Sequence, residues 1–422
     1  MFSVFHTADW HLGQSLCGFD RHYEHAGFLS WLLDNIESRR PDVLLIAGDV
    51  FDSINPSAAA QKSWYEFLAE SIRRHPALQV VVTAGNHDAA ARLEAPSDLM
   101  AALRIHVVGT VQRNETDETD LQRMIVPLRD DRNQLRAVIA AVPFLRPADV
   151  PVVTDADDPY RAGMEQLYRE LAAAARSVVT GESLAAGIPI IGTGHLHVQG
   201  GSETRDSERR LIVGGAEAMR AHLFPAEFTY VALGHLHRRQ SFRGGTIRYS
   251  GSPIPLSFAE TGYEHGVLHL KFDGDSLTDC DTLLVPRAVE MLSVPQSETA
   301  LPLEDVVQEL EALPADTTTD EQHKSFLEVR VRDDGPDPFR RARIEAALAD
   351  KPVRLASIKL IADTTAASRG VQLDLFLHSA GLNAIEPEDI FVQAHQDRFG
   401  AEPDDAVLAA FREIVQQEAQ PA

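Results

Sequence analysis

Five short polar clusters contain the side chains whose types and spacing could do chemistry. They are Asp9-Trp10-His11, Gly48-Asp49-Val50-Phe51-Asp52, Gly85-Asn86-His87-Asp88, Gly194-His195-Leu196-His197 and Gly234-His235-Leu236-His237. Carboxylate, amide oxygen and imidazole groups together suit a divalent first-row metal such as manganese, iron or zinc, and they suit magnesium less because many donors are nitrogen atoms. The clusters therefore predict a site for first-row metal ions.

The number and spacing of these groups favour two ions. Asp9 and His11 are two residues apart, so both can bind one ion only if the backbone leaves strand geometry between them. The glycines at positions 48, 85, 194 and 234 fit tight turns that let the backbone approach the ions closely. The clusters offer more ligands than one ion can take, which suggests two ions about 4 Å apart, a pair suited to phosphoryl displacement.

The elements that must position these clusters are buried strands. The last four clusters follow apolar runs such as LLIA, VVTA, IIGT and VALG. We predict strands at Phe2–Ala8, Asp42–Ala47, Leu78–Thr83, Ala137–Val142, Pro189–Gly192 and Tyr230–Leu233, and helices at Tyr23–Ser38 and Ser57–Arg74. Alternating strands and helices indicate a layered α/β domain, in which the carboxyl ends of the strands converge on one crevice. Shorter alternating segments from Gly244 to Leu283 predict antiparallel strands that close the sheet.

A second, smaller unit follows a change in composition between Pro286 and Pro295. The predicted elements are strands at Val289–Val294, Phe326–Arg332 and Val353–Leu360 and helices at Leu303–Leu313 and Asp337–Ala349. Two amphipathic helices, Glu388–Phe399 and Asp404–Gln416, end the chain. We expect domains at residues 1–283, 284–378 and 379–422.

Composition limits the class of protein. The 422 residues carry a net charge of −24, which excludes binding nucleic acid by a basic surface over the whole molecule but allows a local cationic patch or a groove lined with metal ions. Cys17 and Cys280 are the two cysteines, too few for a disulfide framework. We see neither a membrane-spanning run nor a signal peptide, so we expect a soluble cytoplasmic protein.

The order DxH, GDxxD, GNHD, GHxH and GHxH resembles the calcineurin-like metallophosphoesterase superfamily. The longer strings HTADWHLGQSL, AGDVFD, VPFLRP, ALGHLHR and YSGSPIPLSF resemble, more narrowly, the SbcD family of nuclease subunits from bacterial SbcCD DNA-repair complexes. The resemblance is strong from Phe2 to about Leu283 and weaker beyond. It implies a layered β-sandwich flanked by helices, a small α/β capping domain and a C-terminal helical tail.

The resemblance also implies roles for individual residues. One ion would be held by Asp9, His11, Asp49 and His237, and the other by Asp49, Asn86, His195 and His235, with Asp49 as the bridge. The ions would most readily be Mn²⁺. His87 would stabilise the scissile phosphate or protonate the leaving oxygen, with Asp88 orienting it.

For other residues near the clusters, the sequence gives weaker evidence of a role in metal binding, catalysis or DNA contact. Asp52 fits a supporting or turn-stabilising residue better than a ligand, and the family pattern does not need His197. Trp10 fits the core. Arg92, Arg238 and Arg239 are placed to contact DNA phosphates, although exposed arginines are commonly just solvated.

The resemblance implies partners as well as an activity. The activity would be exonuclease action on double-stranded DNA and endonuclease action on single strands or hairpins. The chain would form a homodimer through helices at Ser57–Arg74 and Leu93–Leu103, within a heterotetramer with an SbcC-type ABC ATPase. The tail, with an apolar stripe at Leu408, Phe411, Ile414 and Val415, would dock on that ATPase or pack on the small module.

Two other functions stay open. A related phosphodiesterase acting on small diesters would keep the five clusters but would have no use for the small module and the tail. A catalytically inactive scaffold would have lost a metal ligand, and none is missing from the clusters.

Overall fold

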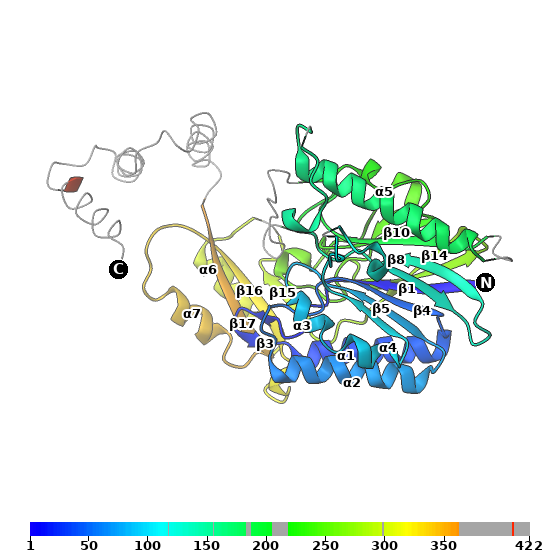
Figure 1. The fold of residues 1–422 in the computed structure, drawn as a ribbon. Coiled ribbons are helices and arrows are strands. Elements are labelled where there is room, and N and C mark those ends of the chain that lie inside the picture. The colour runs from blue at the N-terminus through cyan, green and yellow to red at the C-terminus, as the bar shows by residue number, and fades with distance from the viewer. Residues whose placement is uncertain are drawn as a thin grey trace.

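Two stacked sheets form the main body of the protein. The computed structural model describes residues 1–116, 118–154, 156–182, 187–204, 218–297, 299–362 and 407–408. Figure 1 shows the two sheets packed face to face between helices, with the small module to one side. This arrangement is the predicted layered α/β sandwich.

The first sheet has six strands in the order β14-β13-β1-β4-β5-β6. Their bounds are β1 Phe2–Thr7, β4 Val43–Ala47, β5 Gln79–Thr83, β6 Ile105–Val108, β13 Gly266–Asp273 and β14 Ser276–Leu284. β1, β4, β5 and β6 are parallel, with Val4 opposite Val43 and Val43 opposite Gln79. β13 pairs with β1 antiparallel, and β14 extends that edge antiparallel, as expected for the end of this segment.

The second sheet also has six strands, in the order β11-β12-β10-β9-β8-β7. Their bounds are β7 Ile125–Arg129, β8 Leu135–Ala140, β9 Ile190–His195, β10 Tyr230–Gly234, β11 Gln240–Phe242 and β12 Ile247–Tyr249. One expectation is wrong here: β12 lies parallel to β10 and antiparallel only to β11. The short β11 and a 3₁₀ turn at Arg243–Gly245 return the chain so that β12 runs in the direction of β10.

The buried strands of the first sheet have apolar side chains on both faces, which explains their continuous apolar runs. In β4, Val43 and Leu45 face the second sheet and join the core between the sheets. Leu44 and Ile46 face the opposite way, toward the helices. β4 is completely buried, as a central strand covered on both sides must be.

Helices cover both outer faces of the sandwich. α1 (His22–Arg39) and α2 (Ala58–Arg74) lie on the first sheet, and α5 (Pro159–Thr180) lies on the second (Figure 1). The side chain of Ser57 caps α2 by accepting from the Ala60 amide at 3.1 Å. α5 is absent from the predictions above, although its buried Met164, Leu167, Leu171 and Ala175 fall at helical spacing.

The segment expected as one helix at Leu93–Leu103 is two short helices. α3 spans Ala90–Glu94 and α4 spans Ser97–Ala101, and Pro96 stands between them. Proline lacks an amide hydrogen and its ring clashes with the preceding turn, so one continuous helix cannot form here.

The small module has a parallel three-stranded sheet in the order β15-β16-β17. Its elements are β15 Met291–Val294, α6 Leu303–Glu311, β16 Ser325–Arg332, α7 Arg340–Ala347 and β17 Val353–Ile361. They match the predicted order, and α6 and α7 pack on the sheet through their own core. The tail helices predicted at Glu388–Phe399 and Asp404–Gln416 lie outside the described residues, apart from positions 407 and 408.

A short hairpin near the N-terminus, β2 (Ser15–Leu16) and β3 (Phe19–Asp20), contacts the small module. Leu16 is buried together with Val289, Met291 and Phe326, and Phe19 packs against them. Within the described part of the chain, no helix is both long and apolar enough to cross a membrane.

Candidate metal centre

The five clusters meet at the carboxyl ends of five strands from both sheets. Asp9, Asp49 and Asn86 follow β1, β4 and β5, which are neighbours in the first sheet. His195 ends β9 and His235 follows β10, which are neighbours in the second sheet. Because β4 packs against β9 and β10, residues far apart in the sequence share one buried space.

The backbone leaves strand geometry where the predicted ligands stand. Asp9, His11, Asp49 and His235 all have positive φ values, of 55°, 47°, 50° and 100°. Residues other than glycine seldom adopt this region, and such residues cluster at functional sites. The Asp9 amide donates to the Gly48 carbonyl at 3.0 Å and the His11 amide donates to the Asp49 carbonyl at 3.1 Å, so the two loops hold each other in these turns.

Two glycines make this close packing possible. A Cβ atom at Gly85 would overlap the carboxylate and the amide of Asp49, and one at Gly48 would overlap the imidazole of His195. Gly48 also has a φ of 94°, which disfavours any side chain there. These two positions therefore accept only glycine without movement of a predicted ligand.

Asp49 lies between two groups of histidines. Its Oδ2 atom is 3.2 Å from His195 Nε2 and 3.6 Å from His11 Nε2, and its Oδ1 atom accepts from the His87 amide at 2.8 Å. Burial alone would raise the pKa of Asp49, but the imidazoles of His195, His11 and His87 outweigh it and hold that pKa below its usual range. Asp49 is thus a charged carboxylate at the middle of a buried site.

On one side of Asp49, potential ligand atoms of Asp9, His11 and His237 lie within 4.8 Å of one another. Among the described residues, Asp9 Oδ2 and His11 Nε2 are buried and have no hydrogen-bond partner. Burial raises the pKa of Asp9 against the pull of His195 and His237, so burial disfavours its ionised form. A divalent cation would satisfy these atoms, so the donor set fits a metal ion.

On the other side, Asp9, Asp49 and His195 form a second group with potential ligand atoms within 4.8 Å. His195 Nε2 is 3.0 Å from Asn86 Oδ1, and the imidazole rings of His195 and His235 are 5.4 Å apart. Burial would lower the pKa of His195, but the Asp49 carboxylate raises it to about 9. Burial, then the charge of His195, lowers the pKa of His235 well below its ordinary value.

Comparison with known proteins decides the family. Residues 2–239 match the calcineurin-like phosphoesterase family, and residues 287–399 match the family described as "Type 5 capsule protein repressor C-terminal domain". The chain is 41% identical to the SbcD subunit of the SbcCD nuclease of Rhodobacter capsulatus over 364 residues, which cover 86% of this chain and 88% of the relative. It is 35% identical to the corresponding Escherichia coli K12 protein over 291 residues, which cover 67% of this chain and 68% of that one.

This chain belongs to the SbcD family of calcineurin-like phosphoesterases. The metallophosphoesterase fold and the activity class expected from the sequence are therefore confirmed, and the chain is a phosphodiester hydrolase. The family implies divalent metal ions, and the buried, unpartnered atoms of Asp9 and His11 fit that requirement. The two matched segments fall on either side of β14, but the exact domain boundaries remain a prediction.

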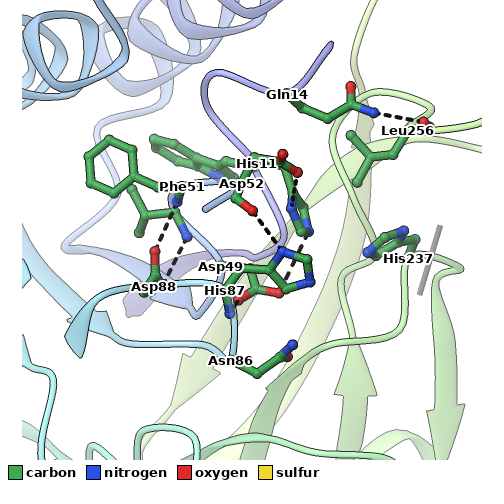
Figure 2. Close-up of polar contacts among 12 residues, drawn as sticks. His11, Gln14, Asp49, Phe51, Asp52, Asn86, His87, Asp88, His237 and Leu256 are labelled. Carbon is green, nitrogen blue, oxygen red and sulfur yellow. Dashed lines mark hydrogen bonds and ion pairs between the residues drawn. The ribbon is translucent and has the colours of Figure 1, made fainter. Parts of the chain in front are cut away.

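In this phosphoesterase fold, outer groups turn the histidines toward the centre. His11 Nδ1 bonds to Asp52 Oδ1 at 3.1 Å, and His195 Nδ1 bonds to the Ala47 carbonyl at 3.0 Å. His237 Nδ1 bonds to Glu260 Oε1 at 2.8 Å. Each acceptor keeps a hydrogen on Nδ1, so the lone pair of the neutral imidazole is on Nε2. Asp52 contacts His11 from outside, as a supporting residue would (Figure 2), and it also forms a third group of potential ligand atoms with His11 and His87.

Glu260 is a residue of this site that we did not predict. It lies two residues beyond the string YSGSPIPLSF and is completely buried. An acidic residue next to a family-like string is only a weak sequence signal, because its contact with His237 spans 23 positions.

His87 lies at the edge of the centre, and its ring is 4.7 Å from that of His11. We expected Asp88 to orient His87; the structure gives His87 Nδ1 a bond to the Asp52 carbonyl at 2.8 Å. The Asp88 carboxylate accepts from the Phe51 amide at 2.9 Å (Figure 2). It also accepts from the amides of Val50 and Gly85, at 3.2 and 2.9 Å, and so ties two loops together. Backbone amides are the nearest donors to a carboxylate buried beneath two turns.

The remaining candidates have contacts with residues other than the proposed ligands. His197 Nδ1 pairs with Glu203 at 2.6 Å, and Arg92 donates to the Ile54 carbonyl at 3.3 Å. Arg238 stacks over Tyr263 at 5.5 Å, while Arg239 pairs with Glu264. Trp10 is in the core as expected, packed against Phe28, Trp64 and Phe67. None of these contacts tests the expected contacts with DNA.

Proposed function

We propose that this chain is the nuclease subunit of an SbcCD-type complex and that it hydrolyses DNA phosphodiesters at a centre for two metal ions. The observation that carries the proposal is the placement of Asp49, a charged and buried carboxylate between His11 on one side and His195 on the other. Membership of the SbcD family and the unpartnered atoms of Asp9 and His11 support it.

The proposed ligands divide into two sets. Asp9, His11, Asp49 and His237 would hold one ion, and Asp49, Asn86, His195 and His235 the other. Asp9 belongs to two of the three groups of potential ligand atoms among the described residues, the two that contain His237 and His195, so it would lie close to both proposed ions. The mixture of nitrogen and oxygen donors suits manganese, iron or zinc, and among these we propose Mn²⁺ from the family resemblance.

Each part of the site has a task in hydrolysis. Bound divalent ions supply Lewis-acid stabilisation of the phosphate oxygens and activate water. His87 would act on the substrate, since its Nδ1 is held by the Asp52 carbonyl and its ring lies beside that of His11. It would stabilise the scissile phosphate or give a proton to the leaving oxygen.

Partners would supply the positive charge for DNA binding that this acidic chain lacks. With a net charge of −24, the protein has little long-range attraction for DNA, so an SbcC-type ATPase and the bound ions would provide much of the positive charge. The small module would help to hold DNA, and the tail would dock on the ATPase. We further propose exonuclease action on double strands, endonuclease action on single strands and hairpins, and a homodimer within a heterotetramer.

The test is a cleavage assay on linear double-stranded DNA and on hairpin DNA, with Mn²⁺ or with EDTA, and with or without the ATPase partner and ATP. We expect cleavage that requires the metal, and cleavage of duplex ends that ATP and the partner stimulate. Absence of metal-dependent cleavage under all these conditions would contradict the proposal. Hydrolysis of a small chromogenic diester without any DNA cleavage would favour the small-diester phosphodiesterase instead.

A further inference from the structure

Glu260 is a fully buried carboxylate beside the proposed metal centre. It is the last residue of the 3₁₀ turn η5 (Phe258–Glu260), which follows β12 of the second sheet in the chain. Its Oε1 atom accepts from His237 Nδ1 at 2.8 Å, and its Oε2 atom accepts from the Leu256 amide at 2.7 Å. Both carboxylate oxygens therefore have a defined donor, and one donor is a proposed metal ligand.

A carboxylate in this position acts on the ligand in two ways. It keeps the hydrogen on Nδ1 and fixes the orientation of the ring, so that the Nε2 lone pair is directed away from Glu260. Its negative charge also makes Nε2 a stronger donor toward a cation. Asp52 has the equivalent contact with His11 Nδ1, at 3.1 Å.

The segment that carries Glu260 is anchored on both sides. The Leu256 carbonyl accepts from the Gln14 side chain at 3.0 Å (Figure 2). The Gln14 backbone amide donates to the His11 carbonyl at 2.9 Å. Phe258 is buried against Met291 and Phe326 of the small module. A carboxylate on a segment held this firmly can hold a histidine in one orientation.

We propose that Glu260 is a positioning residue that orients His237 for one of the two ions. The inference rests on the proposed two-ion function and adds to it a residue that does not contact the ions. The matched substitution is Glu260→Gln, because an amide of the same shape keeps an acceptor oxygen but loses the negative charge. Calorimetric titration with Mn²⁺ is expected to show a loss of roughly 10–100-fold in affinity for one ion, with the other ion unchanged.

A second readout separates positioning from a general structural effect. In the background of His237→Ala, the change Glu260→Gln should cause no further loss of Mn²⁺ affinity, since the residue acts through that imidazole. The visible absorption of Co²⁺ bound in place of Mn²⁺ should also differ between the wild type and Glu260→Gln. Glu260→Asp is the reserve variant if the amide variant does not fold. The aspartate side chain keeps the charge but is too short to reach His237. We therefore expect the same loss of Mn²⁺ affinity for one ion.

Glu328→Gln is the control. Glu328 is also fully buried, and it pairs with Arg330 at 2.8 Å and Lys359 at 3.0 Å within the small module. This control should lower the melting temperature without changing Mn²⁺ affinity. Wild-type affinity for both ions in a folded Glu260 variant, or an equal loss in the His237→Ala background, would overturn the inference. A wild-type protein that binds no ions would instead overturn the proposed function itself.

Discussion

The two sides of the candidate metal centre are built differently. On the side of Asp9, His11 and His237, the outer nitrogens of the histidines are held by Asp52 and Glu260, while Asp9 Oδ2 and His11 Nε2 have no hydrogen-bond partner among the described residues. On the side of Asn86, His195 and His235, the inner nitrogen of His195 already contacts Asn86 at 3.0 Å and Asp49 at 3.2 Å.

This difference shows two ways of preparing a site for a cation. The first side is oriented from outside and leaves buried polar atoms unsatisfied, so an ion there relieves an existing cost. On the second side, the inner nitrogen of His195 already has protein contacts, so an ion there must replace a hydrogen bond and displace a proton from His195. We therefore expect the first side to gain more stability from an ion than the second.

The largest effect should come from Asp49→Ala, because this carboxylate lies between the two sides. We expect loss of detectable nuclease activity and loss of both ions, measured by elemental analysis of the purified variant. Asp42→Ala is the control, since Asp42 bonds to the Ser3 amide at 2.8 Å, just before β4 begins and thus at the end of that strand opposite Asp49. Two ions still bound to Asp49→Ala would mean that Asp49 does not join the two sides.

His87→Ala should separate chemistry from metal binding. His87 contacts the Asp52 carbonyl through its side chain and Asp49 through its backbone amide, which alanine retains. Both ions should stay, while turnover falls by roughly 10²–10⁴-fold, as for loss of a general acid. His75→Ala, which removes a buried histidine bonded to the Pro41 carbonyl, should leave turnover unchanged. Loss of an ion from His87→Ala would make His87 a ligand.

The second side should bind its ion with release of a proton. Asp49 raises the pKa of His195 to about 9, so the metal-free imidazole is charged at neutral pH and must lose its proton to become a ligand. Affinity at this side should rise by up to about tenfold per pH unit from about pH 7 and level off above the pKa. Calorimetry in two buffers of different ionisation enthalpy measures this proton, and equal heats in both buffers would contradict it.

The raised pKa of His195 also makes the stability of the metal-free protein depend on pH. The pKa of His195 in the folded state lies above its unfolded value, so its ion pair with Asp49 stabilises the fold fully below the unfolded pKa. That stabilisation is lost as the pH rises through about 9. Metal-free protein should therefore melt at a lower temperature above this pH.

Much of the fold and the site could be predicted because both depend on local patterns. Continuous apolar runs such as Val43–Ala47 mark strands buried on both faces, and polar clusters directly after them mark the crevice. The turn expected between Asp9 and His11 is present, with positive φ at both residues. The layered α/β class follows from such features, whereas the two-sheet sandwich was expected only from the resemblance to the phosphoesterase superfamily.

Other features depend on contacts that no local pattern reports. The parallel pairing of β12 with β10 depends on the path of the short β11, and the break between α3 and α4 depends on one proline. Asp88 and Glu260 are both acidic residues near the clusters, yet one binds backbone amides and the other a histidine. Only the packing of distant loops assigns these partners.

The smallest effects concern stability without metal, where the two sides should respond with opposite signs. Asp9→Asn removes a buried charge whose Oδ2 atom has no partner among the described residues, while Oδ1 can still accept from the His235 amide at 2.9 Å. In EDTA this variant should raise the free energy of unfolding by about 1–3 kcal/mol. Asn86→Ala removes a hydrogen-bond partner of His195, and in EDTA it should lower the free energy of unfolding by about 0.5–1.5 kcal/mol.

Urea unfolding with EDTA and with Mn²⁺ measures both changes. With Mn²⁺, both variants should gain less stability than the wild type, because each lacks a ligand, and ligand binding stabilises the folded state by mass action. Asn35→Ala is the control, since Asn35 lies in α1 and bonds to Trp31 and Arg39, so its effect should be the same with and without metal. Destabilisation of the metal-free protein by Asp9→Asn would mean that the carboxylate is satisfied without an ion, and the contrast between the two sides would then be wrong.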